Sequence, residues 1–185
     1  MAATQSNEAL HLGIAEQGKI LALDGNHKEA LRHYREAIRL TVQHKSPDVF
    51  FQHYTQCVME SLELSGAHGE VIDYCKKMQD FLAKQDATNP MVNQGIASAL
   101  EKEAIQHLLR QEPTEALPLL QQAQKRGGRG KLPLADQLLN WVQRGYTVDP
   151  RQVKDAQKRH QYFIVRRDKV DPARAITLPK AVSPL

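Results

Sequence analysis

The sequence predicts an all-α protein. Its apolar residues recur at helical spacing, as Leu31, Tyr34 and Ile38 do. Glycine and proline punctuate long stretches of this kind, and almost nothing alternates with the period of two that strands require. At 185 residues the chain is long enough for one domain with a hydrophobic core, or for a short array of repeats. We therefore expect about eight helices.

The first four helices are separated by turn residues. Gly25 is expected to end the first helix and Gly66 the third, because glycine adopts the backbone conformation that closes a helix. Ser46 followed by Pro47 predicts an N-cap and a first helical residue for the third helix. The expected ranges are residues 7–24, 26–44, 46–64 and 68–84.

The fifth and sixth helices follow the segment QDATNP. Asn89 and Pro90 repeat the combination of a cap and a proline start. Pro118 falls inside the sixth helical pattern, so we expect that helix to have a distorted first turn or to start late. The expected ranges are residues 89–110 and 112–126.

Two shorter helices are expected after a basic, glycine-rich linker at residues 127–131. Gly145 should end the seventh helix. Asp149, Pro150 and Gln152 then predict a capping box with a proline start for the eighth. The expected ranges are residues 132–144 and 150–163, and we interpret residues 132–164 as a closing helix pair.

The chain also repeats itself. The segment GNHKEALRHYREAI aligns with GAHGEVIDYCKKM, and EPTEALPLLQQA forms a third copy. The first two copies pair Gly25 with Gly66, His27 with His68, Glu29 with Glu70, and Leu31 with Ile72. One helix pair cannot bury its apolar face alone, so neighbouring pairs must stack, which predicts a superhelical solenoid.

These residues resemble the tetratricopeptide repeat family over about residues 7–126, within a first segment placed at residues 1–126. The first repeat matches the family pattern at Gly18, Leu21, Gly25, Ala30, Tyr34 and Ala37. The second half of another repeat matches it at Ala116, Leu120 and Ala123. The chain departs from the pattern at Gln17, Met59, Val71 and Met78, and its spacing is longer. The resemblance implies a solenoid of antiparallel helix pairs in which small residues let the helices approach.

The resemblance also implies a concave groove that binds a polypeptide partner. Its groove-facing positions would be Lys19, His53, Gln56, Glu60, Glu101, Lys102 and Ile105. We therefore expect a non-catalytic adaptor, scaffold or assembly factor that binds a protein partner, within a larger complex.

Positive charge gathers late in the chain. From Gly145 onward nine Lys and Arg stand against four Asp, although the whole chain has a net charge of only +4. The expected basic contact consists of Arg151, Lys154, Lys158, Arg159, Arg166 and Arg167. Such a cluster is typical of a second contact with nucleic acid, an acidic protein or an anionic membrane, and also of a solvated helix face.

The last segment, residues 165–185, has three prolines and no helical period, which predicts an extended or disordered tail. Its aliphatic residues exceed what a solvated tail needs, so we expect docking either on a partner or on the chain's own helices. Two other functions stay open at this stage. One is a nucleic-acid-associated regulator that uses the basic region, and the other is a self-assembling subunit of a larger complex.

No catalytic, metal-binding or cofactor-binding motif is evident. Cys57 and Cys75 lie inside apolar helical patterns, which indicates reduced core thiols. The segment KRGGRGKLP lacks the first glycine and the Ser or Thr of a phosphate-binding loop. We therefore expect no enzyme activity and no cofactor.

Neither a membrane span nor a secretory signal is evident. No apolar run approaches the roughly 18 residues that cross a bilayer, and the first residues, MAATQSNEALHL, lack the basic and apolar regions of a signal peptide. We expect a cytoplasmic protein.

Overall fold

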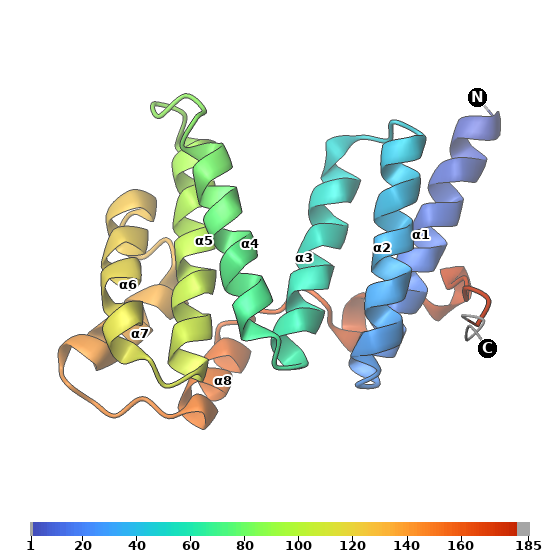
Figure 1. Cartoon of the computed structure of the whole chain (residues 1–185). Helices are drawn as coiled ribbons and strands as arrows, with labels where there is room; N and C mark the ends of the chain where they lie inside the picture. The colour runs from blue at the N-terminus through green and yellow to red at the C-terminus, as the bar shows by residue number, and fades with distance from the viewer. Residues whose placement is uncertain (1, 181–185) are drawn as a thin grey trace. The chain divides into compact units, whose positions relative to one another are not determined.

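The computed structural model describes residues 2–180, and the side chains of residues 8–180. Within these residues the protein is all-helical and has no strand, which confirms the predicted fold class (Figure 1). The helices are α1 (Ala2–Leu23), α2 (His27–Gln43), α3 (Asp48–Leu64), α4 (His68–Leu82), α5 (Pro90–Leu109), α6 (Pro113–Gly127), α7 (Pro133–Gln143) and α8 (Pro150–Arg159). Two short 3₁₀ helices follow, η1 (Arg167–Lys169) and η2 (Pro172–Arg174). No helix in the described part of the chain is long and apolar enough to cross a membrane.

The predicted capping residues explain where several helices begin. The Asn89 side chain accepts a hydrogen bond from the Met91 amide at 2.9 Å, with Pro90 as the first residue of α5. Asp149 and Gln152 form the predicted capping box of α8. Gly25 follows the end of α1 with a φ of +80°, a left-handed conformation that glycine adopts without strain. These boundaries are therefore determined by local side-chain chemistry.

The third helix begins differently from the prediction. Pro47 is its N-cap residue and makes no side-chain cap, so Ser46 is not the cap. The Ser46 hydroxyl instead lies 3.3 Å from Nε2 of His11 on α1. The Ser46 hydroxyl therefore makes a tertiary contact instead of the helix cap that the local sequence pattern predicted.

Two other boundaries also differ. α1 begins at Ala2 rather than residue 7. α6 begins at Pro113, within the predicted start, and continues through Pro118. α8 ends at Arg159 instead of residue 163. The backbone of Gln161 is left-handed, with a φ of +50°, and the Tyr162 amide donates to the Gln157 carbonyl at 3.0 Å. This turn closes α8 early.

The chain forms two compact units, divided after Ser65 and after Phe163. Unit 1 contains residues Met1–Ser65 and Ile164–Leu185, and unit 2 contains Gly66–Phe163. Unit 1 is therefore built from both ends of the sequence. These divisions differ from the expected segments at residues 1–126, 127–131, 132–164 and 165–185.

In unit 1, α1 packs against α2, and α2 packs against α3 (Figure 1). Small residues allow the α1–α2 contact, as the sequence predicted. A Cβ atom added to Gly18 would lie 2.7 Å from the Tyr34 ring, and Ala30 and Ala37 are fully buried. Among the described residues, the core of unit 1 includes two small clusters, one around Ile14, Ala15, Ala37, Leu40 and Tyr54, and one around Ala30, Tyr34 and Cys57.

In unit 2, α4, α5, α6 and α7 pack in chain order, and α8 lies against α5 and α7. One large apolar cluster joins α5, α6, α7 and α8. It contains Ala104, Ile105, Leu108, Ala116, Leu120, Leu134, Ala135, Leu138, Leu139, Val153 and Ala156. The Gly-rich stretch before α7 is held by the Asp136 carboxylate, which accepts the Gly130 amide at 2.7 Å.

Candidate peptide-binding surface

Residues 164–178 of unit 1, which contain no α-helix, lie along its three α-helices; we call them the return segment. It begins where the chain leaves unit 2 and contains both 3₁₀ helices (Figure 1). η2 packs against α1, and the rest of the return segment makes contacts with α2 and α3. The structure thus shows one expected form of tail docking, on the chain's own helices.

Glu60 of α3 binds the beginning of the return segment. Its carboxylate oxygens accept hydrogen bonds from the main-chain amides of Ile164 and Val165, one amide to each oxygen. The Glu60 side chain is buried, and hydrogen bonds to a charged acceptor are stronger than neutral ones. Ile164 and Val165 also pack against the Ala30, Tyr34 and Cys57 cluster. The start of the return segment is therefore held by one buried, charged carboxylate.

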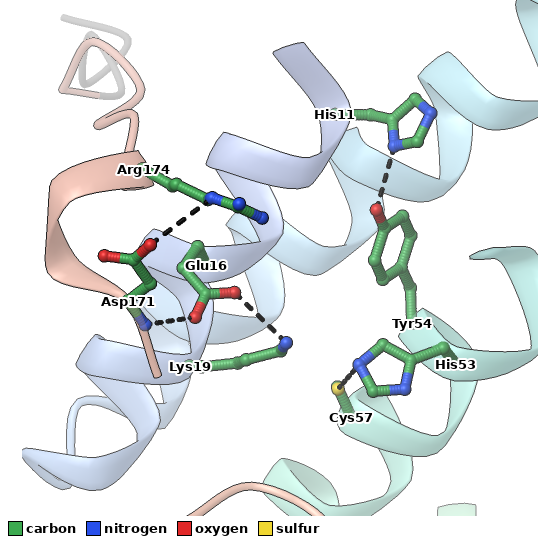
Figure 2. Close-up of polar contacts among 8 residues, drawn as sticks. All are labelled: His11, Glu16, Lys19, His53, Tyr54, Cys57, Asp171 and Arg174. Atoms are coloured by element: carbon green, nitrogen blue, oxygen red, sulfur yellow. Dashed lines mark hydrogen bonds and ion pairs between the residues drawn. The ribbon is translucent and has the colours of Figure 1, made fainter. Parts of the chain in front are cut away.

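Glu16 of α1 binds the middle of the return segment. Oε1 of Glu16 accepts the Asp171 amide at 2.7 Å, and Oε2 accepts the Lys19 ammonium at 3.1 Å (Figure 2). Asp171 caps η2 by accepting the Ala173 amide, and it pairs with Arg174 at 3.3 Å. The Glu16 carboxylate therefore joins α1 to the return segment, and Lys19 of the same helix neutralises its charge.

The end of the return segment lies against Gly13 and His33. The Ile176 amide donates to the Gly13 carbonyl at 2.9 Å. The Leu178 amide donates to Nε2 of His33 at 3.1 Å. Nδ1 of His33 is 2.8 Å from the Glu29 carbonyl, which can only accept, so Nδ1 holds the proton and Nε2 is free to accept. Leu178 packs against the cluster around Ile14.

Gly13 shapes the surface at this point. A Cβ atom on Gly13 would lie 2.5 Å from Cδ1 of Ile176 and 2.6 Å from the Arg174 carbonyl. Such distances do not occur, so α1 can receive the return segment only because residue 13 has no side chain.

A weaker contact lies at the end of α1. Arg167 donates to the Leu23 carbonyl at 3.2 Å and to the Asp24 carboxylate at 3.4 Å. A cation is favourable beside the free carbonyls of a helix C-terminus. Both side chains of the ion pair are more than half exposed, so it contributes little.

Polar side chains of α1 and α3 make further contacts in unit 1 (Figure 2). Nδ1 of His11 lies 2.8 Å from the Tyr54 hydroxyl, and burial lowers the pKa of His11 and raises that of Tyr54. Nε2 of His53 lies 3.9 Å from Sγ of Cys57. Burial raises the pKa of the Cys57 thiol to about 12, so the thiol is protonated at neutral pH and a poor nucleophile.

The predicted groove residues fall in both units. In unit 1, Lys19 and Glu60 take part in the contacts above, His53 lies beside Cys57, and Gln56 is exposed. The return segment, rather than solvent, lies against Glu60. Of these four residues, Glu60 binds the return segment directly and Lys19 pairs with Glu16, which also binds it.

The unit 2 members have structural roles. Ile105 is fully buried in the apolar cluster, and Glu101 is buried and accepts the Ala135 amide at 2.9 Å at the start of α7. Burial raises the pKa of Glu101. These two side chains therefore do not line a surface, because α7 and α8 cover this part of α5. Lys102 donates to the Tyr162 hydroxyl at 2.8 Å and lies 4.4 Å from the ring centroid.

The predicted basic contact is divided between the units. Arg151, Lys154, Lys158 and Arg159 are exposed on α8 in unit 2. Arg166 and Arg167 belong to unit 1, where Arg167 contacts the end of α1. The structure thus does not assemble all six residues within one unit.

Sequence reasoning missed Gly13, Glu16 and His33 as binding residues. These residues accept hydrogen bonds from main-chain amides through a carbonyl, a carboxylate oxygen and a ring nitrogen, and main-chain amides have no residue-specific signature in a sequence.

No known protein family, curated protein or solved structure matches the chain. The described side chains include no cluster of His, Cys, Asp or Glu that could hold a metal ion.

Proposed function

We propose that this protein is a non-catalytic adaptor that binds an extended segment of a partner polypeptide on the α1–α3 surface of unit 1. The observation that supports the proposal is the mode of binding of the return segment. Five of its main-chain amides, those of Ile164, Val165, Asp171, Ile176 and Leu178, donate to acceptors on α1, α2 and α3. Main-chain amides are common to all polypeptides, so a surface that binds them suits a peptide ligand.

We also propose that the helix pairs are tetratricopeptide-like and stack as a superhelical solenoid. The support is the close α1–α2 crossing at Gly18, Ala30 and Ala37, which are the small positions of the resemblance. Repeat proteins of this kind offer extended concave surfaces to partners. A cytoplasmic location and membership of a larger complex belong to the same proposal.

The test uses the full chain with one blocking substitution. Gly13→Leu places a side chain where the bound polypeptide passes, while Gly69→Leu places the same side chain on α4, where a Cβ would meet nothing within 4 Å. We expect the wild-type and Gly69→Leu proteins to retain the same partner from native lysate and Gly13→Leu to lose it. Nuclease treatment of the lysate should not change the result.

Two results would count against the proposal. Retention of the same proteins by Gly13→Leu and Gly69→Leu would show that α1–α3 is not the binding surface. Loss of binding on nuclease treatment, together with dependence on Arg151 and Lys154, would favour the nucleic-acid alternative.

A further inference from the structure

The side chains of the return segment show which partner sequence the surface fits. Ile176 lies against the backbone of Gly13, and Leu178 packs against the cluster of Ile14, Ala37 and Tyr54. Thr177, between them, is exposed. In extended chain, residues two apart lie on the same face. The contact therefore selects two aliphatic side chains separated by one unrestricted residue.

The two ends of the return segment are held unequally. At its start, both amides next to the unit boundary bind the buried Glu60 carboxylate. At its far end, Ile176 remains 38% exposed, although its amide and that of Leu178 are bound. Between the two ends, the Asp171 amide donates to the Glu16 carboxylate, and the Arg167–Asp24 pair is largely exposed and weak. The far end can therefore open while the anchor at Glu60 holds.

Covalent attachment offsets this weakness. A tethered segment competes at an effective concentration in the millimolar range, so it occupies its site even when each contact is modest. A free ligand with the same chemistry must exceed that local concentration or bind more tightly.

We infer that residues 164–178 are a built-in competitor, and that the partner's extended segment displaces their far end with its own Ile-x-Leu pair. This inference rests on the proposed function, since it names the partner chemistry and the regulation of the same surface. The competitor keeps the surface covered until a partner segment with matching aliphatic spacing arrives.

The test uses the full chain and a fluorescent peptide with the sequence of residues 164–180. Ile176→Asp/Leu178→Asp removes the two aliphatic contacts, whereas the control Thr177→Asp adds a charge at the exposed position between them. We expect the peptide to bind the double variant at least about tenfold more tightly than wild type or Thr177→Asp, by fluorescence anisotropy. Adding Gly13→Leu to the double variant should abolish binding, and a peptide with both aspartates should not bind.

A second measurement needs no variant. Excess unlabelled peptide added to the wild-type chain should accelerate hydrogen exchange of the Ile176 and Leu178 amides more than that of Ile164 and Val165. Equal binding by all variants, or unchanged exchange under excess peptide, would overturn the inference. If Gly13→Leu still loses the lysate partner in that case, the proposed function stands and only the competitor fails.

Light scattering tests whether the surface is occupied by the return segment of a second copy of the chain. A wild-type mass near twice 20.9 kDa that returns to 20.9 kDa in Ile176→Asp/Leu178→Asp would show that the surface holds the segment of a second copy. That result would overturn competition within one chain. We expect a mass of 20.9 kDa for both proteins.

Discussion

Unit 2 and unit 1 are both built from antiparallel helices, but they close their cores by different means. Unit 2 is one continuous stretch in which one large apolar cluster joins helices α5 to α8, with a smaller cluster between α5 and α6. The described residues of unit 1 include two small clusters, and non-helical residues cover part of each: Leu178 covers one, and Ile164 and Val165 cover the other. A helix layer that lacks a further helix still has to be covered, and here an extended segment covers it. A surface covered in this way is well suited to exchange one polypeptide for another.

The largest expected effect is in the core of unit 2. Leu138→Ala removes a fully buried side chain from the large cluster, and we expect the free energy of unfolding to fall by about 2–5 kcal/mol. The protein's single tryptophan, Trp141, packs against the same cluster, so urea unfolding followed by its fluorescence reports on unit 2. Met91→Ala, at a methionine of the same unit that is 81% exposed, is the control and should change stability by less than about 0.5 kcal/mol. Equal effects would mean that the cluster is not the core.

A comparable change in unit 1 tests the α1–α2 crossing. Gly18→Ala adds a Cβ only 2.7 Å from the buried Tyr34 ring, so overpacking should exceed the helix-propensity gain and cost about 1–2 kcal/mol. The loss should be visible by circular dichroism, with the Trp141 transition unchanged. Gly69→Ala, in open space on α4, should be neutral or slightly stabilising. A stable Gly18→Ala protein would argue against the close crossing.

The next largest effect is expected at Glu60, which holds the start of the return segment. Glu60→Gln replaces a charged acceptor that serves two amides with a group that has one acceptor oxygen, at a cost of about 1–2 kcal/mol. Hydrogen exchange at Ile164 and Val165 should accelerate about tenfold. Glu36→Gln, which disrupts the partly exposed Arg39 pair, is the matched control and should leave those amides unaffected.

The smallest expected effect is the pH dependence of unit 1. Burial lowers the pKa of His11, His27 and His53 in the folded protein. Because their folded pKa lies below the unfolded value of about 6.5, the unfolded chain takes up protons first as the pH falls. The free energy of unfolding of unit 1 should be highest above pH 6.5 and decrease below it. Circular dichroism should show this as a lower midpoint of urea unfolding.

A substitution assigns this effect to one group. His11→Gln keeps a polar side chain beside Tyr54 but does not titrate, so it should reduce the decrease between pH 7.5 and 5.5. His160→Gln, on the unit 2 side, should leave the circular dichroism midpoint of unit 1 as dependent on pH as in wild type. Stability that rises on acidification would contradict the assignment.

The helices were predictable because their signals are local. Asn89 with Pro90, and Asp149 with Gln152, cap helices a few residues away, and the small residues of α1 and α2 repeat along one pattern. Ser46 shows the limit of this logic, since a distant histidine uses its hydroxyl. Local chemistry fixes boundaries only where no tertiary partner competes.

The contact between the helices and the return segment was predictable only in part. Lys19 and Glu60 follow from the resemblance, and the aliphatic residues of the tail indicated docking. The pairing itself joins residues more than 100 positions apart, as in Glu60 with Val165, and it is made through main-chain amides that any residue provides. Glu101 and Ile105 were assigned to a groove because the sequence does not show that α7 and α8 cover that side of α5.

The division of unit 1 between the two ends of the sequence has a consequence for biosynthesis. Ribosomes add about 5–20 residues per second, and 98 residues, Gly66–Phe163, separate α3 from the segment that covers it. The nascent α1–α3 layer is therefore uncovered for roughly 5–20 s during translation. In that interval the growing chain is open to capture by a chaperone or an early-bound partner, before its own competitor has been synthesised.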